Sequence, residues 1–212
     1  MKKPLTLVAG LALAFFILTS SVMLTLSLKA TYTWSQPEIR QVEYQLDDAT
    51  IRRNYDHLID YMFQGKEARL SFSGLPMSPQ GEIHFMEVKD IFQFFFKGMI
   101  VSGILSLILG AYLIRQQHPE FLTLGTLLVF LVPALLAVPV LIDFNATFIK
   151  FHELAFSNDY WIFDPSLDPI IRYLPESLFL KNTLVILAFI LLWILLIQIL
   201  CKLLKRKMRR SA

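Results

Sequence analysis

Four long apolar runs dominate the pattern of hydrophobic and polar positions along the chain. They extend over residues 4–28, 98–114, 121–142 and 182–201. Each run is close to the roughly 20 apolar residues that a helix needs to cross the hydrocarbon core of a bilayer. The second run is the shortest, but residues 91–96 extend it past Lys97, whose long side chain can reach the headgroups. The pattern therefore predicts four transmembrane helices.

These runs divide the chain into spans and connecting segments. The predicted spans are residues 1–28, 91–114, 121–142 and 182–201. A short turn, 115–120, joins the second span to the third, and residues 202–212 form a basic tail. The remaining segments, 29–90 and 143–181, are too long for linkers and too short for two independent cores. We expect them to fold on each other as one cap.

Lysine and arginine indicate the orientation of the spans. Lys2, Lys3, Arg115 and the basic tail all lie on one side if there are four spans, and that side holds nine basic residues against one acid, Glu120. The opposite side holds eleven basic residues and sixteen acids. Cytoplasmic loops carry the excess of lysine and arginine. The sequence predicts a multi-pass protein of the plasma membrane with both termini cytoplasmic and the cap extracellular.

The first span has an alternative interpretation as a cleaved signal peptide, because it opens with two lysines. Its apolar run is longer than the 7 to 15 residues of a signal peptide's hydrophobic region, however. We therefore expect residues 1–28 to be a membrane anchor.

The first outside segment is expected to contain a helix and a hairpin. Asp47 and Asp48 can cap a helix that ends near Gly65, because apolar residues recur on one face: Ile51, Tyr55, Leu58, Ile59 and Met62. Residues 69–72 and 82–85 alternate in polarity on either side of turn residues 74–81, which predicts a short β-hairpin. The predicted fold class is an all-α membrane protein, a four-helix transmembrane bundle with an extracellular α+β cap.

The second outside segment is rich in aromatic residues. Phe148, Phe151 and Ala155 share one helical face with His152, so we expect a short helix lying at the membrane surface. The sequence Phe-Asp-Pro at 163–165 is expected to end this region of helix.

The composition agrees with a membrane protein and excludes several kinds of functional site. Of the 212 residues, 55% are hydrophobic and 17% charged, and the mean hydropathy is +0.55. One cysteine and eight glycines exclude a disulfide scaffold, a four-cysteine zinc site and a glycine-rich phosphate loop. The net charge of +3 comes from the tail, so we expect no nucleic-acid partner.

The four histidines are the candidates for proton-transfer chemistry, because their free pKa is close to neutral pH. His118 lies in the cytoplasmic turn, and His57 lies on the polar side of the cap helix. His84 and His152 differ, since each stands beside aromatic residues at the outer end of a span. They are either amphipathic rings at headgroup level or an acid and base pair, with nearby carboxylates to orient them.

Other chemistries fit less well. His152-Glu153 begins like the metalloprotease motif H-E-x-x-H, but Phe156 stands where the second histidine belongs. No G-x-S-x-G motif is present, and Cys201 lies at the opposite end of the bundle. We expect no metal and no cofactor. A transporter is disfavoured, because the four runs contain no ionisable residue at mid-span.

Two segments resemble a known family. Residues 82–90, EIHFMEVKD, and residues 151–165, FHELAFSNDYWIFDP, are similar to those of the bacterial lipoprotein intramolecular transacylases, called Lit. The layout of four spans and an extracellular cap agrees over the whole chain. The resemblance implies that a diacylglyceryl lipoprotein passes the fatty acid on its sn-2 glycerol oxygen to the amine of its own N-terminal cysteine. It also implies two catalytic histidines, His84 and His152.

The chemistry of these residue types fits that reaction. The ammonium must lose a proton and the departing glycerol oxygen must gain one, which an imidazole can mediate, while a second imidazole stabilises the oxyanion. Residues expected to bind substrate or orient the histidines are Asn158, Asp159, Trp161, Asp164, Phe151 and Phe85. Which histidine starts as base stays open, as does the oligomeric state. The alternatives are a noncatalytic membrane scaffold that binds a partner protein and a metal-dependent membrane hydrolase.

Overall fold

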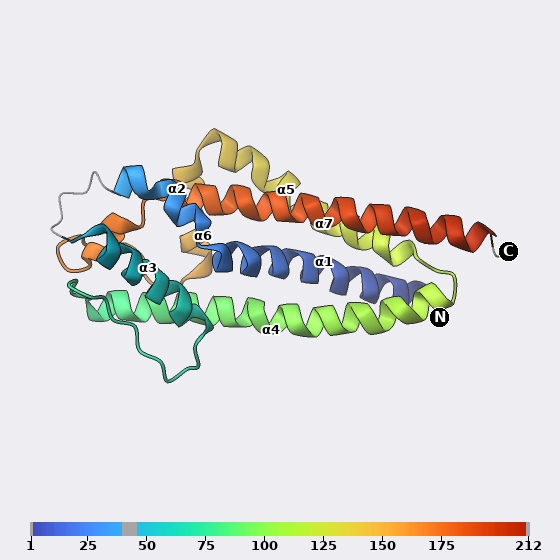
Figure 1. Ribbon diagram of the computed structural model, residues 1–212, viewed down its shortest axis with the longest axis horizontal. Coiled ribbons are helices and arrows are strands. Elements are labelled where there is room, and N and C mark those ends of the chain that lie inside the picture. The colour runs from blue at the N-terminus through green and yellow to red at the C-terminus, as the bar shows by residue number, and fades with distance from the viewer. Residues whose placement is uncertain (1, 40–45, 211–212) are drawn as a thin grey trace. The chain divides into compact units, whose positions relative to one another are not determined.

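The computed structural model describes residues 2–39 and 46–210, and its elements are helices (Figure 1). The elements, in chain order, are α1 (Lys2–Leu28), α2 (Ala30–Ile39), α3 (Asp48–Phe63), α4 (Pro79–Arg115), α5 (Glu120–Ile142), α6 (Phe144–Ala155), a 3₁₀ turn η1 (Pro169–Tyr173) and α7 (Glu176–Arg210). Residues 40–45, within the predicted cap segment, and residues 1, 211 and 212, within the predicted first span and tail, lie outside the described residues.

The structure contains the four candidate membrane-spanning helices that the sequence predicts. Helices long and apolar enough to cross a membrane are Lys3–Leu28, Pro79–Arg115, Glu120–Ile142 and Glu176–Arg210. α4 and α7 have 37 and 35 residues, more than the roughly 20 that the hydrocarbon core requires. α4 already begins at Pro79, before the predicted span, and α7 continues through the basic tail to Arg210.

The described chain divides into two compact units. Unit 1 consists of Met1–Leu24, Phe95–Leu141 and Leu184–Ala212, and unit 2 of Thr25–Phe94 and Ile142–Thr183. α4 and α7 therefore each contribute one part to unit 1 and another to unit 2.

Unit 1 is a helical bundle in which α1 and α5 approach closely. A Cβ atom on Gly125 of α5 would lie 2.8 Å from Leu13 and 3.0 Å from the carbonyl oxygen of Gly10, both on α1. Small residues at such contacts allow membrane helices to pack through their backbones. Outward side chains are apolar, as at Leu107 and Leu135, which are 74% and 75% exposed. Apolar exposure of this kind suits contact with lipid.

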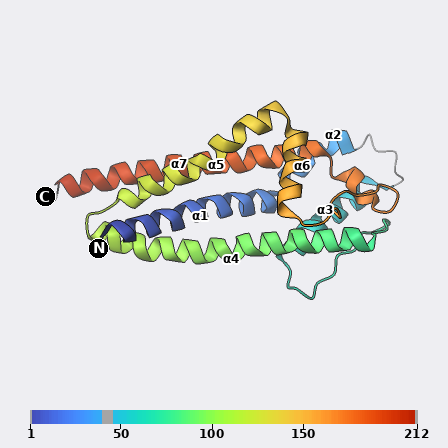
Figure 2. The same cartoon turned by 180° about the vertical axis from the view of Figure 1, so that it is seen from behind.

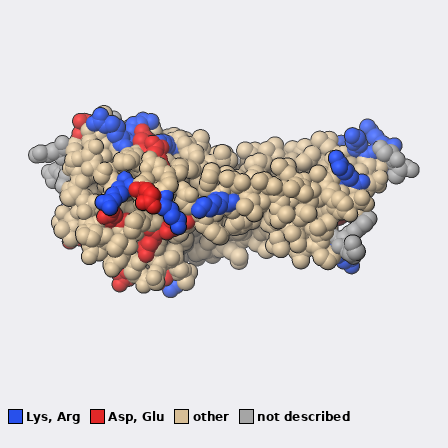
Figure 3. All heavy atoms as spheres, turned by 90° about the horizontal axis from the view of Figure 1, so that it is seen from below, with Lys and Arg blue, Asp and Glu red and all other residues tan. Residues whose placement is uncertain are grey.

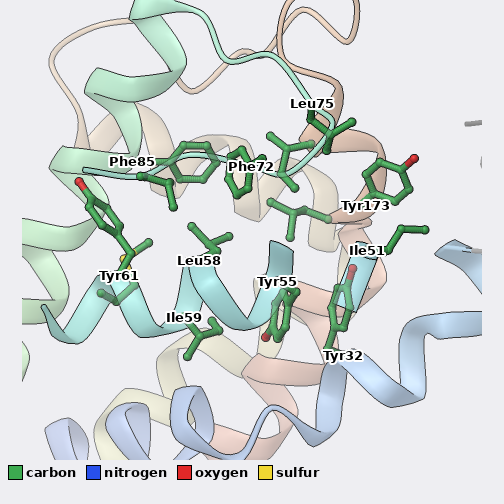
Figure 4. Packing of buried hydrophobic residues seen from close by; sticks show 14 of the residues in the cluster. Tyr32, Ile51, Tyr55, Leu58, Ile59, Tyr61, Phe72, Leu75, Phe85 and Tyr173 are labelled. Atoms are coloured by element: carbon green, nitrogen blue, oxygen red, sulfur yellow. The ribbon is translucent and has the colours of Figure 1, made fainter. Parts of the chain in front are cut away.

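Unit 2 has its own apolar core, drawn in Figure 4. The predicted apolar face of α3 is buried: Ile51, Tyr55, Leu58, Ile59 and Met62. The predicted N-cap of α3 is also present, since Asp47 Oδ1 accepts a hydrogen bond of 2.7 Å from the backbone N–H of Thr50. The helix ends with Gln64 as its C-cap, one residue before Gly65.

The predicted β-hairpin is wrong, and so is the α+β description of the cap. Residues 82–85 lie in the first turns of α4, and the described residues contain only an isolated bridge between Phe72 and Leu75. Four alternating residues are too few to separate a strand from a helix. Unit 2 is helical throughout its described elements.

A hydrogen-bonded start explains why α4 begins where it does. Pro79 opens the helix, and Ser78 Oγ accepts a hydrogen bond of 2.9 Å from the backbone N–H of Gly81. The carboxylate of Asp168 accepts from the N–H of Ser78 at 2.7 Å and from its hydroxyl at 2.6 Å. Gly81 is required for this approach, because a Cβ there would overlap the Asp168 carboxylate. The turn before η1 thereby fixes the first turn of the helix that carries His84.

Candidate active site

Within unit 2, α4 and α6 bring His84 and His152 together. The centroids of the two imidazoles lie 6.1 Å apart. Phe156 contacts both, with ring centroids 4.8 Å from His84 and 5.7 Å from His152. In Figure 2 α6 runs crosswise to α4, the helix that carries His84. The two histidine segments that are distant along the chain therefore share one site.

His84 is enclosed by aromatic rings. Its side chain belongs to a residue only 5% exposed, and the rings of Phe156, Phe163 and Phe85 lie within 4.8 to 6.0 Å, centroid to centroid. Its Nδ1 atom is buried and has no hydrogen-bond partner among the described residues. Leaving a buried polar atom unpaired costs about 1–3 kcal/mol, so such an atom calls for a functional explanation.

The imidazole of His152 is held in one tautomer. Its Nδ1 lies 2.7 Å from the backbone carbonyl oxygen of Phe148, one helical turn earlier on α6. A carbonyl oxygen only accepts hydrogen bonds, so Nδ1 carries the proton and Nε2 of the neutral ring is a free acceptor. Burial lowers the pKa of His152 below its ordinary value of 6.5, with the Phe148 hydrogen bond acting in the opposite direction. Burial therefore favours the neutral form of His152, in which Nε2 is the basic nitrogen.

Aromatic rings surround His152, and the helix that carries it, α6, is largely exposed. Phe148 and Trp161 lie 4.2 and 5.0 Å from it, and Phe151 meets it edge to face at 5.4 Å. α6 itself has no buried residue, and its apolar side chains Phe151 and Leu154 are 56% and 78% exposed. Such a helix suits a membrane surface, as the sequence pattern predicted.

Asn158 joins the aromatic loop after α6 to α4. Its Nδ2 donates a hydrogen bond of 2.7 Å to Glu87 Oε1, and its Oδ1 accepts from the backbone N–H of Tyr160 at 3.0 Å. Glu87 lies on α4 three residues after His84. The second oxygen of Glu87 is buried and has no hydrogen-bond partner in the part of the chain that the structure describes. Asn158 thus fixes the position of the loop that carries Trp161.

The structure brings some of the predicted substrate residues to the histidines and not others. Trp161, Phe151 and Phe85 contact an imidazole directly. The Asp164 carboxylate instead accepts from the backbone N–H and hydroxyl of Ser166, which holds its pKa below the ordinary range. Asp159 is exposed, and its carbonyl accepts from the N–H of Ile162 in a turn. Both aspartates therefore shape the loop.

Four contributors to the site were not assigned from the sequence: the Phe148 carbonyl, Phe156, Phe163 and Asp168. The Phe148 carbonyl was foreseeable, since residues four apart on a helix are hydrogen-bonding neighbours. From the sequence, Phe156 was considered only as the residue that breaks the H-E-x-x-H motif, and Phe163 only as part of the Phe-Asp-Pro sequence at 163–165. Asp168 gave no local signal, because its partner Ser78 is 90 residues away. No group of three or more histidine, cysteine, aspartate or glutamate side chains within residues 2–39 and 46–210 has a metal-binding arrangement.

The fold and the site define a membrane-integral helical protein with two imidazoles enclosed by aromatic rings. The family model described as lipoprotein intramolecular transacylase Lit matches residues 7–179. The chain belongs to this family, and it is an enzyme, an intramolecular transacylase. This membership favours the transacylase hypothesis over the scaffold hypothesis.

Solved structures of the membrane-integral lipoprotein intramolecular transacylase Lit from Bacillus cereus are similar over the whole length. One is 35% identical with a TM-score of 0.92, and the match covers 99% of this chain and 98% of that chain. A variant with a histidine replaced by arginine is 34% identical, with a TM-score of 0.87 and coverage of 100% and 95%. A histidine-to-alanine variant is 35% identical, with a TM-score of 0.88 and coverage of 99% and 96%. Comparison with curated protein sequences gives no match.

Proposed function

We propose that this enzyme moves a fatty acyl chain within one diacylglyceryl lipoprotein, from the sn-2 glycerol oxygen to the N-terminal cysteine amine, giving a lyso-form lipoprotein. His84 and His152 carry the proton transfers. The observation that supports this most strongly is the pair of imidazoles at 6.1 Å inside one aromatic cluster. Membership of a family named for lipoprotein intramolecular transacylation supplies the substrate class.

His152 starts as the general base. Its tautomer leaves Nε2 as a proton acceptor, and its lowered pKa favours the neutral form. The amine of the substrate reaches the site mainly as an ammonium, which cannot attack an ester until it loses a proton. Nε2 accepts that proton, and the Phe148 carbonyl then stabilises the imidazolium through Nδ1–H.

His84 acts on the ester carbonyl. An N–H at its Nδ1, an atom with no partner among the described residues, can donate a hydrogen bond to the oxyanion that forms when the amine attacks. The new bond is between the amine nitrogen and the acyl carbon, and the bond that breaks joins this carbon to the glycerol oxygen. The nitrogen loses two protons in all. The first is released to water through Nε2 before the attack, and the second, accepted by Nε2 as the new bond forms, is delivered by the imidazolium to the departing glycerol oxygen. No water is consumed, and no acyl-enzyme forms.

The remaining contribution is confinement of the two reacting groups. Amine and ester belong to one molecule, so holding them in contact replaces an encounter with a conformational choice, worth about 7 kcal/mol or more in favourable cases. Trp161, Phe151 and Phe85 form apolar walls next to the imidazoles. Asn158 is a positioning residue, because its bond to Glu87 fixes the loop that carries Trp161.

The proposed location is the plasma membrane, with both termini cytoplasmic and unit 2 outside. The support is the concentration of lysine and arginine near the termini, together with Arg115 at the C-terminal end of α4. The apolar exposed face of α6 would then lie in the outer interface, where the lipid-modified end of the substrate resides.

The function is tested with a reporter lipoprotein in a bacterium that makes diacylated lipoproteins and has no lipoprotein N-acyltransferase. Substrate and product have the same mass, so tandem mass spectrometry must distinguish the N-acyl from the O-acyl isomer. The intact protein should produce the N-acyl isomer, and His84→Ala and His152→Ala should not. The matched control His57→Ala, on α3, should stay active.

A crossover experiment tests whether transfer is intramolecular. Two reporters with acyl chains of different length are supplied together to the purified protein. Each N-acyl product should carry its own chain. Exchanged chains would contradict transfer within one molecule, and a histidine variant that retains activity would contradict the assigned roles.

A further inference from the structure

Unit 1 contains a cavity on the face of α7 that adjoins α5. Its volume is about 530 Å³. Four basic side chains at the C-terminal end of α7 line it: Lys202, Lys205, Arg206 and Arg209. The rest of the lining comes from Thr123, Leu195, Gln198, Ile199 and Cys201. The lining residues of α7 recur at spacings of three and four along the helix. They therefore form one continuous face of α7.

The lining changes from apolar to basic along α7. Leu195 and Ile199, 57% and 48% exposed, lie toward the middle of the helix, and the four cations lie toward its end. A second hollow of about 330 Å³ shares Thr123 and Lys205 with the first and is lined also by Leu124, Leu127 and Glu120. The two hollows together combine a cationic rim with an apolar floor.

The charges at this site are unbalanced. The first cavity is lined by four basic side chains and no acid, and the neighbouring hollow by one acid, Glu120. None of the four forms an ion pair with a carboxylate in residues 2–39 and 46–210. Figure 3 shows lysine and arginine side chains gathered around the C-terminal end of α7, at the right of the picture. An anion placed there would gain charge-assisted hydrogen bonds from several donors.

We propose that this cavity binds one anionic phospholipid, with the phosphodiester among the four basic side chains and an acyl chain along Leu195, Ile199 and Leu127. The apolar lining favours a phospholipid over free phosphate, because phosphate has no apolar group that could contact leucine and isoleucine. Basic cavities between membrane helices are suited to such headgroups. The site is separate from the histidines, which belong to unit 2.

Diffuse attraction of a basic tail to an anionic surface would not need a cavity. The chain supplies a matched pair for separating the two cases, because Lys207 and Arg210 belong to the same two turns of α7 but do not line the cavity. The double variant Lys205→Gln/Arg209→Gln removes one lysine and one arginine from the lining. Lys207→Gln/Arg210→Gln removes the same charge from outside it.

The test is a lipid titration of the full chain in uncharged detergent, followed by native mass spectrometry, with phosphatidylglycerol and phosphatidylcholine as the probes. Phosphatidylglycerol should bind saturably at one molecule per chain and phosphatidylcholine much more weakly. Each basic residue near bound anionic lipid contributes about a fivefold factor, so Lys205→Gln/Arg209→Gln should weaken phosphatidylglycerol binding about 30-fold at low salt. The control pair should change it less than about threefold.

Three outcomes would overturn the proposal. They are equal affinity for the two lipids, equal loss in the two double variants, and displacement of phosphatidylglycerol by millimolar inorganic phosphate. Binding is read without any acyl transfer, so the result does not depend on the proposed function.

Discussion

Asp168 offers a sharp test of how the fold supports the site. The change Asp168→Asn keeps the size of the side chain but replaces one carboxylate oxygen with an amide NH₂. The Ser78 hydrogen bonds, at 2.7 and 2.6 Å, then lose their charged acceptor, and an NH₂ that faces the Ser78 hydroxyl can no longer accept from it. A hydrogen bond to a charged group contributes about 1.5–3 kcal/mol, and Asp168 is only 3% exposed, so water cannot replace it.

That loss should lower the melting temperature and the activity together. For a chain of this size 1 kcal/mol corresponds to about 2–4 °C, so the expected decrease is about 3–12 °C. The first turn of α4 would fray, and His84 lies just after it, so kcat should fall more than KM rises. Thermal unfolding followed by tryptophan fluorescence and the rate of N-acyl formation measure the two effects.

The matched control is Asp47→Asn. Asp47 is the exposed N-cap of α3, and asparagine caps a helix as well as aspartate does, so both readouts should change little. In a double-mutant cycle, the losses in Ser78→Ala and Asp168→Asn should be less than additive, because both changes remove the hydrogen bond between the Ser78 hydroxyl and the Asp168 carboxylate, while Ser78→Ala also removes the cap on Gly81. Unchanged stability in Asp168→Asn, or full additivity in the cycle, would refute the account of how α4 begins.

Two further predictions concern the histidines and their loop. Burial lowers the pKa of His152 below 6.5 in the folded protein, so kcat/KM should fall on the acid side of its pH profile with a midpoint below pH 6.5. A midpoint above pH 7 would contradict the role of a neutral His152 as the base. Because the unfolded chain binds this proton more readily, stability should also fall as the pH drops below 6.5. Asn158→Ala should lower kcat about tenfold or more, as judged by single-turnover rates, while Glu87→Gln, which keeps an oxygen to accept from Asn158, should lower it less. Equal losses in these two variants would mean that the hydrogen bond itself is not what positions the loop.

The parts of the fold that were predicted correctly are those with a long periodic pattern of apolar residues. The four apolar runs, the buried face of α3 with its Asp47 cap, and the short helix of residues 144–155 all depend on signals within one element. The start of α4 was missed because residues 82–85 are too few to define a period. α2 was also missed; its ten residues, ATYTWSQPEI, have no marked apolar face.

The site was predictable in its residue types but not in its contacts. His84 and His152 were identified because each stands among aromatic residues at the end of a span, and the structure places their rings together. The roles of the Phe148 carbonyl, Asp168 and the Asn158–Glu87 hydrogen bond depend on which atoms meet in three dimensions. Asp164 shows the opposite case. It was expected to act on the histidines, but its carboxylate accepts a hydrogen bond from the hydroxyl of Ser166 in its own turn.

The most direct test of the two-imidazole mechanism is a single-turnover measurement with purified protein and a synthetic diacylated lipopeptide. The first-order rate of N-acyl formation is compared for the intact protein, His84→Gln, His152→Gln and the double variant. Each single change should lower the rate by about 10²–10⁴-fold, and the double variant should be little slower than the slower single variant, because the two rings act as a unit. A single variant with near-normal rate, or losses that multiply in the double variant, would contradict that mechanism.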